Sequence, residues 1–262
     1  MRSIHGDFFS IPAMVMVRLI ELAEPGDEFS LRAKGMLAGW NGAMAPDAVA
    51  PAIYAAFRVK LLHKIIGHLV GPLADVMFTS TGRGAPRHLA ELASQIVNRA
   101  KTGDPSFLPP GASWRSLASE ALEEAVAYLR SRWGDDMAAW KWGAVHRTSP
   151  QHPISRLFPG LASLLDPPSL PMGGDGDTPL ASGYSPGRPF AVTLLSIVRY
   201  VFDPSDWDHS CWAVPHGVSG HPGSPHYADQ APIWANVELV PMLYTWERIK
   251  AQAESQQTLE PL

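Results

Sequence analysis

The segment that most restricts how this chain folds is Gly217–Gln230, which reads GVSGHPGSPHYADQ. Proline has no backbone N–H and breaks helices, and glycine weakens both helices and strands. Pro222 and Pro225 therefore exclude a helix here, as Pro215 does just before it. The segment should be irregular but ordered, because its Ser, His and Gln side chains can hydrogen-bond to backbone groups. We expect His226 to be buried and hydrogen-bonded in this way.

The first half of the chain carries apolar residues at helical spacing. They recur every three or four residues in Ile11–Leu22, Ala48–Val70 and Ser116–Trp133. Gly134 follows the third stretch and is typical of a helix C-terminus. The first stretch is far too short to span a bilayer. Residues 1–145 are therefore predicted to be mainly helical.

The second half has a different character. Proline, glycine and serine are frequent in residues 146–189, which predicts a long surface excursion. The apolar run Phe190–Phe202 and the shorter run Cys211–Val214 predict β-strands. A final helix is expected within Trp234–Ala253, where Thr245 is placed to cap it.

Composition excludes several classes of protein. The 262 residues, with 46% hydrophobic and 18% charged residues, are typical of a folded protein of one or two domains. A net charge of −4 gives no basic field for nucleic acid or anionic membranes. Cys211 is the single cysteine, so no intramolecular disulfide forms. The apolar stretch after Asp7 is interrupted by Pro12 and is not a signal peptide, so the localisation stays unknown.

Five motifs in order resemble the penicillin acylase family. Gly217–Gln230, followed by Trp234, is similar to the family's C-terminal signature G-x-S-G-x-P-x-S-P-H-Y-x-D-Q. Four further stretches resemble family segments: Leu37–Met44, Trp140–His146, Gly173–Thr178 and Ser196–Asp203. Their order and spacing hold from about residue 4 to the end of the chain. Nearly the whole chain is therefore covered by the resemblance.

The resemblance implies an α+β fold. Members are N-terminal nucleophile hydrolases with a four-layer αββα core. This chain would supply the C-terminal portion of that core. Residues 1–145 would form a mainly helical region, and residues 146–262 a Pro/Gly-rich excursion, closing β-strands and a C-terminal helix. Both regions would be parts of one larger parent domain.

The resemblance also implies a mechanism for the parent family. A precursor cleaves itself, and the new β-subunit begins with a serine whose hydroxyl attacks a linear amide while its own α-amine acts as base. Backbone N–H and an Asn side chain form the oxyanion hole, and water then hydrolyses the acyl-enzyme. Family substrates are amides with an apolar acyl group, such as penicillins, cephalosporins or acyl-homoserine lactones. No cofactor is implied.

The resemblance places the nucleophilic serine upstream of the region that begins near Asp7. We therefore expect no catalytic residue in this chain, and no hydrolysis by the chain alone. An upstream acylase fragment carrying the nucleophile is the partner this implies. The alternatives are the scaffold half of a split acylase and a non-catalytic interaction module.

The family-signature positions in this chain are interpreted as structural. They are Gly217, Ser219, Gly220, Ser224, His226, Tyr227, Asp229, Gln230, Arg199 and Asp203. The alternative for His226 is a general base. Trp140 and Trp142 are interpreted as core fillers, with a substrate pocket as the alternative.

Three other patterns suggest chemistry and are interpreted as structural. His216, His221 and His226 lie near Asp206 and Asp208, but the sequence has no H-E-x-x-H or paired C-x-x-C motif, so no metal site is predicted.

Asp175 and Asp177 lie in a Gly-rich turn that lacks the distal Glu of a calcium loop, so a solvated turn is predicted. Gly183–Gly187 fits a nucleophile elbow, yet the residue after its serine is Pro186, which has no N–H for an oxyanion hole. A Pro/Gly turn is predicted instead. The strand run from Val192 to Phe202 is expected to expose apolar side chains and to promote self-association.

Overall fold

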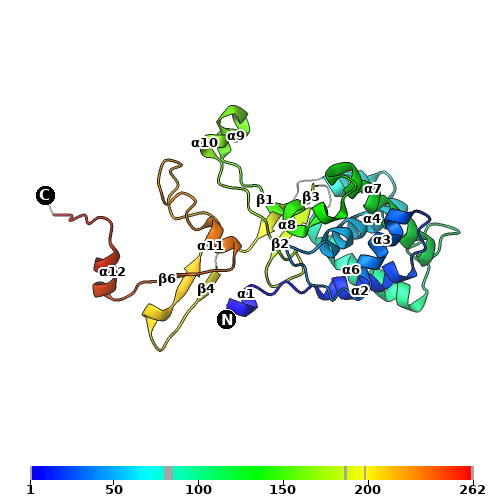
Figure 1. The fold of residues 1–262 in the computed structure, drawn as a ribbon, viewed down its shortest axis with the longest axis horizontal. Coiled ribbons are helices and arrows are strands. Elements are labelled where there is room, and N and C mark those ends of the chain that lie inside the picture. The colour runs from blue at the N-terminus through cyan, green and yellow to red at the C-terminus, as the bar shows by residue number, and fades with distance from the viewer. Residues whose placement is uncertain (1, 80–84, 186–187, 198, 261–262) are drawn as a thin grey trace. The chain divides into compact units, whose positions relative to one another are not determined.

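A computed structural model describes residues 2–79, 85–185, 188–197 and 199–260 (Figure 1). Contacts divide the chain into two compact units, described separately below. The helical unit comprises Gly6–Gln151 and Pro168–Ser196. The signature unit comprises Met1–His5, His152–Pro167 and Ile197–Leu262. Residues 168–196, which composition grouped with the C-terminal region, thus belong to the helical unit.

The helical unit begins with a run of helices. They are α2 (Ile11–Leu22), α3 (Glu28–Leu37), α4 (Ala50–Val70), α5 (Leu73–Thr79), α6 (Ala85–Thr102), α7 (Trp114–Trp133), the 3₁₀ turn Met137–Trp140 and α8 (Trp142–Val145). The helices expected from periodicity at α2, α4 and α7 are confirmed. Ser10 caps α2 by accepting a hydrogen bond from the backbone N–H of Ala13, and Gly134 ends α7 with a φ of 80°.

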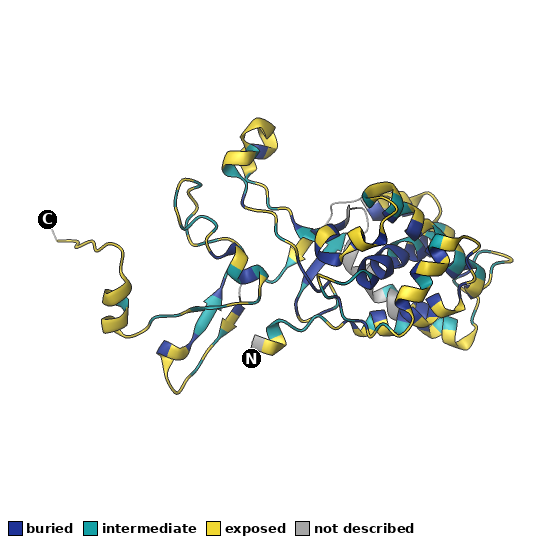
Figure 2. Ribbon diagram, viewed as in Figure 1, coloured by how far each residue is buried: buried dark blue, intermediate teal, exposed yellow. Residues whose placement is uncertain are grey.

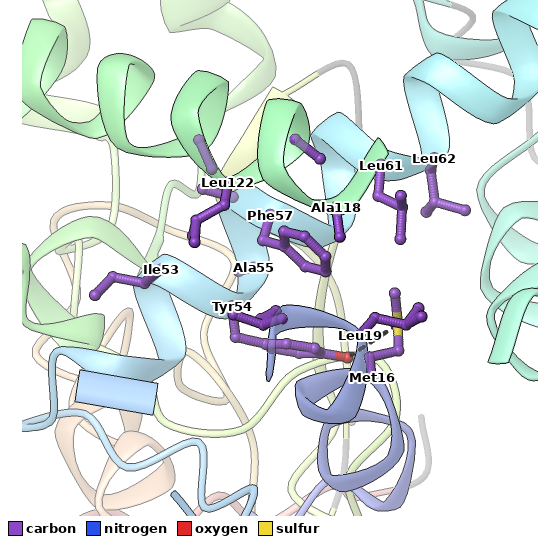
Figure 3. Packing of buried hydrophobic residues seen from close by; sticks show 14 of the residues in the cluster. Met16, Leu19, Ile53, Tyr54, Ala55, Phe57, Leu61, Leu62, Ala118 and Leu122 are labelled. Atoms are coloured by element: carbon purple, nitrogen blue, oxygen red, sulfur yellow. Dashed lines mark hydrogen bonds between the residues drawn. The ribbon is translucent and has the colours of Figure 1, made fainter. Parts of the chain in front are cut away.

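Helix α4 forms the centre of this unit and is buried along its first two turns (Figure 2). Its main neighbour is α7, and α2 packs against both. Figure 3 shows Phe57 and Leu61 of α4 close to Ala118 and Leu122 of α7, and all four belong to the same buried cluster. The Tyr54 hydroxyl lies 3.8 Å from the sulfur of Met16 in α2. The first two turns of α4, Ala50–Phe57, are apolar on every side, as a core position requires.

A three-stranded sheet completes the helical unit. It contains β1 (Arg147–Thr148), β2 (Ser182–Ser185) and β3 (Arg188–Leu195) in the order β1-β3-β2. Strand β1 is parallel to β3, and β2 is antiparallel to it.

The prediction of a surface excursion over 146–189 is wrong for the part that leads into β2. Met172 and Gly173 there are buried. The reason is close packing that only small residues allow. A Cβ atom at Gly173 would lie 3.1 Å from the ring of Pro46, and one at Gly143 would lie 3.0 Å from it.

The signature unit is built around a second small sheet. Its strands β4 (Arg199–Val201), β5 (Cys211–Ala213) and β6 (Val240–Pro241) are antiparallel, in the order β4-β5-β6. Its helical segments are α1 (Arg2–His5), α9 (Pro153–Leu157), α10 (Ala162–Leu165), α11 (Ala231–Ala235) and α12 (Trp246–Gln252), with 3₁₀ turns at Pro159–Leu161 and Trp207–His209.

These elements confirm the α+β class, because the main helices α2–α7 all precede two small sheets that are largely antiparallel. The single apolar run Phe190–Phe202 is divided between β3 and β4, which belong to different units. Thr245 is the N-cap residue of α12, as expected, but its side chain makes no capping hydrogen bond. Among the described residues, no helix has the length and apolar character needed to cross a membrane.

Candidate functional site

The signature segment Gly217–Gln230 is an irregular loop that follows β5 and leads directly into α11. Backbone hydrogen bonds close it in two places. The N–H of Ser219 donates to the carbonyl of His226 at 3.0 Å, and the N–H of Gln230 donates to the carbonyl of His216 at 2.9 Å. The Gln230 side chain also accepts from the backbone N–H of Val214 at 3.1 Å. The expected ordered loop, held partly by polar side chains, is confirmed.

Two positions of the loop have a clear steric or bonding role. A Cβ atom at Gly217 would lie 2.1 Å from the carbonyl oxygen of His226, so only glycine fits there. The Tyr227 hydroxyl donates to the carbonyl of Leu165 at 2.7 Å and ties the loop to α10. By contrast, a Cβ atom at Gly220 would meet nothing within 4 Å. The signature therefore mixes positions with strict and loose spatial requirements.

His226 is not buried, so that prediction is wrong. Its side chain is 38% exposed and lies between two carboxylates. Its Nδ1 is 2.8 Å from Asp229 Oδ2, and its Nε2 is 3.0 Å from Glu254 Oε2. The hydrogen bond to Asp229, followed by that to Glu254, raises the pKa of His226 to about 9. A charged imidazole between two carboxylates favours a solvated position. A protonated imidazole also has no lone pair with which to act as a base.

Arg199 and Asp203 are not brought together. The Arg199 guanidinium is buried, lies 4.3 Å from the centre of the Trp234 ring, and donates from Nη1 to the Trp234 carbonyl. Burial lowers the pKa of Arg199 to about 10, and its Nη2 has no hydrogen-bond partner within the described part of the chain. The Asp203 carboxylate instead accepts from the backbone N–H of Ser205 at 3.0 Å.

The histidines and aspartates near this loop are engaged in small separate contacts, such as His209 with Asp206 at 3.4 Å. In the described ranges, no three His, Cys, Asp or Glu side chains are placed to hold a metal ion. Asp208, for example, accepts from the backbone N–H groups of Tyr244 and Thr245 at 2.7 and 3.2 Å, just before α12. Asp206 likewise accepts from the N–H of Asp208 at 3.0 Å. These carboxylates thus organise turns.

A second cluster lies inside the helical unit, and sequence reasoning missed it. Arg58 of α4 is buried, with its Nη1 2.5 Å from Asp177 Oδ2 and 3.8 Å from Asp175 Oδ2. Asp175 is fully buried, so the predicted solvated turn is wrong at this position. The G-G-D-G-D-T motif was the sequence signal for this cluster. Arg58 could not be linked to it, because Arg58 lies 119 residues before Asp177 in sequence.

The turn Gly173–Thr178 connects several segments of the helical unit. Gly174 has a φ of +75°, and a Cβ atom on it would lie 2.1 Å from a backbone carbonyl oxygen, so glycine is required. Its N–H donates to the carbonyl of Met44 at 2.8 Å, and its carbonyl accepts from the Trp142 indole at 2.8 Å. The Ser182 N–H donates to the carbonyl of Asp175 at 3.1 Å.

His146 lies in the same unit and is fully buried. It stacks on Trp142 with ring centres 4.2 Å apart, and its Nδ1 lies 2.8 Å from the carbonyl oxygen of Phe190. Desolvation lowers the pKa of His146 to about 4, so the ring is neutral and Nδ1 carries the hydrogen that the carbonyl accepts. Its Nε2 and the Tyr184 hydroxyl have no hydrogen-bond partner among the described residues.

The remaining sequence patterns lie in the helical unit. The indole N–H groups of Trp140 and Trp142 donate to the carbonyls of Gly134 and Gly174 at 3.0 and 2.8 Å, and both rings are fully buried, as core fillers would be. In the G-x-S-x-G pattern, residues 183–185 lie in β2, and Pro186 and Gly187 lie outside the described residues.

The penicillin amidase family model matches residues 1–251. The chain belongs to the penicillin amidase family.

Relatives with known names agree with this assignment. Penicillin acylase 2 proenzyme of Pseudomonas sp. strain SE83 is 37% identical over 99% of this chain and 32% of its own length. Acyl-homoserine lactone acylase QuiP of Pseudomonas aeruginosa is 26% identical over 76% of this chain and 25% of its own length. The chain thus spans about a third or less of the length of these relatives.

A solved structure also matches. Thermostable penicillin G acylase from Alcaligenes faecalis aligns with a TM-score of 0.49 and 20% sequence identity, over 98% of this chain and 47% of that one.

Proposed function

We propose that residues 1–262 are the C-terminal part of an amide hydrolase of the penicillin amidase family. In this proposal they supply scaffold, and a polypeptide segment that they do not contain supplies the nucleophile. The substrate would be a linear amide with an apolar acyl group, such as a penicillin or an acyl-homoserine lactone. The similarity to penicillin acylase 2 proenzyme over only 32% of its length supports this division of labour.

The observation that carries the proposal is the state of the two histidines in family-like motifs. Both ring nitrogens of His226 face carboxylates, and Nδ1 of His146 bonds a backbone carbonyl. Within the described part of the chain, neither ring is hydrogen-bonded to a hydroxyl or thiol that it could activate. Nucleophilic catalysis needs such a pair, or a nucleophile that carries its own base.

The signature unit also supports a missing partner, because the two faces of its sheet differ. One face carries Arg199 and Ala213, which are buried, and Arg199 contacts Trp234 of α11. On the other face, Tyr200 and Trp212 are paired across the strands with stacked rings 6.3 Å apart. Tyr200 also stacks on Phe202, with ring centres 5.3 Å apart.

Trp207 continues this row at 6.5 Å from the Phe202 ring, and Tyr244 lies 6.1 Å from Trp207. We call the surface made by Tyr200, Phe202, Trp207, Trp212 and Tyr244 the aromatic face. Tyr200 is 42% exposed, Phe202 55% and Tyr244 66%. A contiguous exposed aromatic surface is typical of an interaction site. We propose that the rest of an acylase chain covers it, since the relatives are about three times longer than the region they share with this chain.

A complementation experiment tests the proposed function. Residues 1–262 are produced alone and together with the part of penicillin acylase 2 proenzyme that lies outside the match. Hydrolysis of a penicillin and of an acyl-homoserine lactone is then measured by release of the free amine. We expect turnover only from the combination. Turnover by residues 1–262 alone, at a rate proportional to their concentration, would contradict the proposal.

A variant at the aromatic face separates the scaffold role from that of an independent interaction module. Tyr200→Ser combined with Phe202→Ser should abolish complementation while leaving the helical unit folded. If the double variant complements as well as the parent chain, the aromatic face is not the contact surface. If no combination is active but residues 1–262 remain a stable monomer, the interaction-module alternative is favoured.

A further inference from the structure

One arginine serves two carboxylates inside the helical unit. The Nη1 atom of Arg58 is 2.5 Å from Asp177 Oδ2, which is a direct ion pair. The same atom is 3.8 Å from Asp175 Oδ2, beyond hydrogen-bonding distance. Of the two carboxyl groups, only Asp175 is completely removed from water, because the Asp177 side chain keeps 17% of its surface exposed. The Arg58 guanidinium thus pairs directly with Asp177, the more exposed carboxylate, and only weakly with the fully buried Asp175.

The two oxygens of Asp175 are in different situations. Oδ1 accepts a hydrogen bond from the backbone N–H of Asp177 at 2.7 Å. Oδ2 has no hydrogen-bond partner among the described residues. An ionised carboxylate with one unsatisfied oxygen is costly in a buried place, whereas the neutral acid is much less so. The geometry thus favours a proton on Asp175.

The surroundings of Asp175 as a whole also favour its protonated form. Arg58 and Tyr54 face it from α4, Asp177 from the turn and Tyr184 from β2. Arg58 favours ionisation of Asp175 and Asp177 opposes it, while burial raises the pKa of both tyrosines above the ordinary value, so they stay neutral. Desolvation is the largest influence and raises the pKa of Asp175 to about 6.

We propose that Asp175 keeps a proton in mildly acidic solution and that Arg58, Asp175 and Asp177 form a proton-dependent clamp between α4 and the turn Gly173–Thr178. The backbone of the turn bonds the backbone of Met44 and of Ser182 and the indole N–H of Trp142. A charge that appears on Asp175 therefore acts on the place where four separate segments of the helical unit meet. The unit becomes less stable as this proton is lost.

The direction of the pH effect follows from the raised pKa. In the unfolded chain an aspartate titrates at about 3.9. In the folded chain Asp175 holds its proton up to about pH 6. Its contribution to stability is therefore complete below the unfolded pKa and is lost as the pH rises through the folded pKa. Carboxylates with lowered pKa values have the opposite pH dependence, so the test must isolate Asp175.

The substitution Asp175→Asn isolates it, because asparagine has the same shape and cannot ionise. Urea unfolding of residues 1–262 is measured for the parent chain and for the variant at pH 5 and pH 8. We expect the folded-to-unfolded ratio of the variant, relative to the parent chain, to rise about tenfold between the two pH values. The control Asp135→Asn, at an exposed aspartate paired with Arg130, should show no such gain.

Infrared spectroscopy gives a second readout that does not depend on reversible unfolding. The parent chain should show a protonated-acid carbonyl band that titrates near pH 6 and is missing in Asp175→Asn. A ratio independent of pH together with no such band would show that Asp175 is ionised and would overturn the proposal. If Asp175→Asn does not fold, titration of the band in the parent chain alone decides the question.

Discussion

The helical unit and the signature unit differ in how far they bury their apolar side chains. The helical unit buries a continuous apolar cluster and even takes a charged cluster, Arg58 with Asp175 and Asp177, into its interior. The signature unit covers only one face of its sheet and leaves aromatic rings such as Phe202 in solvent. The first has a core of its own. The second leaves an aromatic surface exposed, which in our proposal another segment of an acylase covers.

The two motif histidines show the same contrast in electrostatic terms. His146 has a pKa lowered to about 4 because it is desolvated. His226 has a pKa raised to about 9 because it bonds Asp229 and Glu254. One ring is a neutral packing element, and the other is a charged link between a loop and the C-terminal segment. The same residue type thus has two structural roles.

A phenylalanine truncation in each unit should show the largest difference. Phe57→Ala opens a cavity in the central helix, and we expect it to cost about 3–5 kcal/mol of unfolding free energy. Phe202→Ala removes an exposed ring, and it should change the stability by less than about 0.5 kcal/mol. Urea denaturation followed by circular dichroism measures both. Equal losses would mean that the aromatic face belongs to a closed core.

Alanine substitutions at two glycines of the signature loop should give a smaller loss of stability. In Gly217→Ala the new methyl group would collide with the His226 carbonyl, so we expect a loss of about 1–3 kcal/mol. Gly220→Ala is the matched control, because no atom lies within 4 Å of the place that its methyl group would take. Thermal melts of the two variants make the comparison. If both behave alike, the loop is not held as described.

Self-association should depend on the aromatic face. Sedimentation of residues 1–262 should show concentration-dependent association that weakens in Phe202→Ser. The matched control is Leu69→Ser, at an exposed apolar position of α4 in the helical unit, which should leave the association unchanged. Equal behaviour of the two variants would remove the aromatic face as the interacting surface.

The smallest effect is expected at His226. Its raised pKa means that the link to Asp229 and Glu254 contributes fully below about pH 6.5, the ordinary histidine value, and is lost as the pH rises through about 9. Protease cleavage after α12 should therefore speed up at high pH in the parent chain. In His226→Ala it should be fast at every pH, whereas His221→Ala should resemble the parent. A pH-independent cleavage rate in the parent chain would contradict the link.

Sequence reasoning succeeded where local physics dominates. The apolar spacing predicted α2, α4 and α7, and the prolines and glycines of Gly217–Gln230 predicted an irregular loop. It failed where burial depends on distant partners. Asp175 looked like a residue of a solvated turn, because nothing near it in sequence reveals Arg58.

The prediction that His226 is buried was wrong for a related reason. The local sequence gives polar neighbours but not the distant carboxylate of Glu254, which keeps the ring charged and partly in solvent. The run Phe190–Phe202 reads as one strand, yet it forms parts of two sheets. Its apolar and β-branched residues predict a strand, but they do not predict which sheet the strand joins. The structural interpretation of the remaining signature residues stays a prediction.

Active-site titration tests the central claim most directly, which is that residues 1–262 contribute scaffold and no nucleophile. Purified residues 1–262 are treated with a serine-directed acylating inhibitor, and the covalent label is counted by intact mass. The account predicts no stoichiometric label on the isolated chain, and labelling of the complementing segment in an active combination. One labelled serine per isolated chain, with loss of amide hydrolysis in parallel, would contradict it.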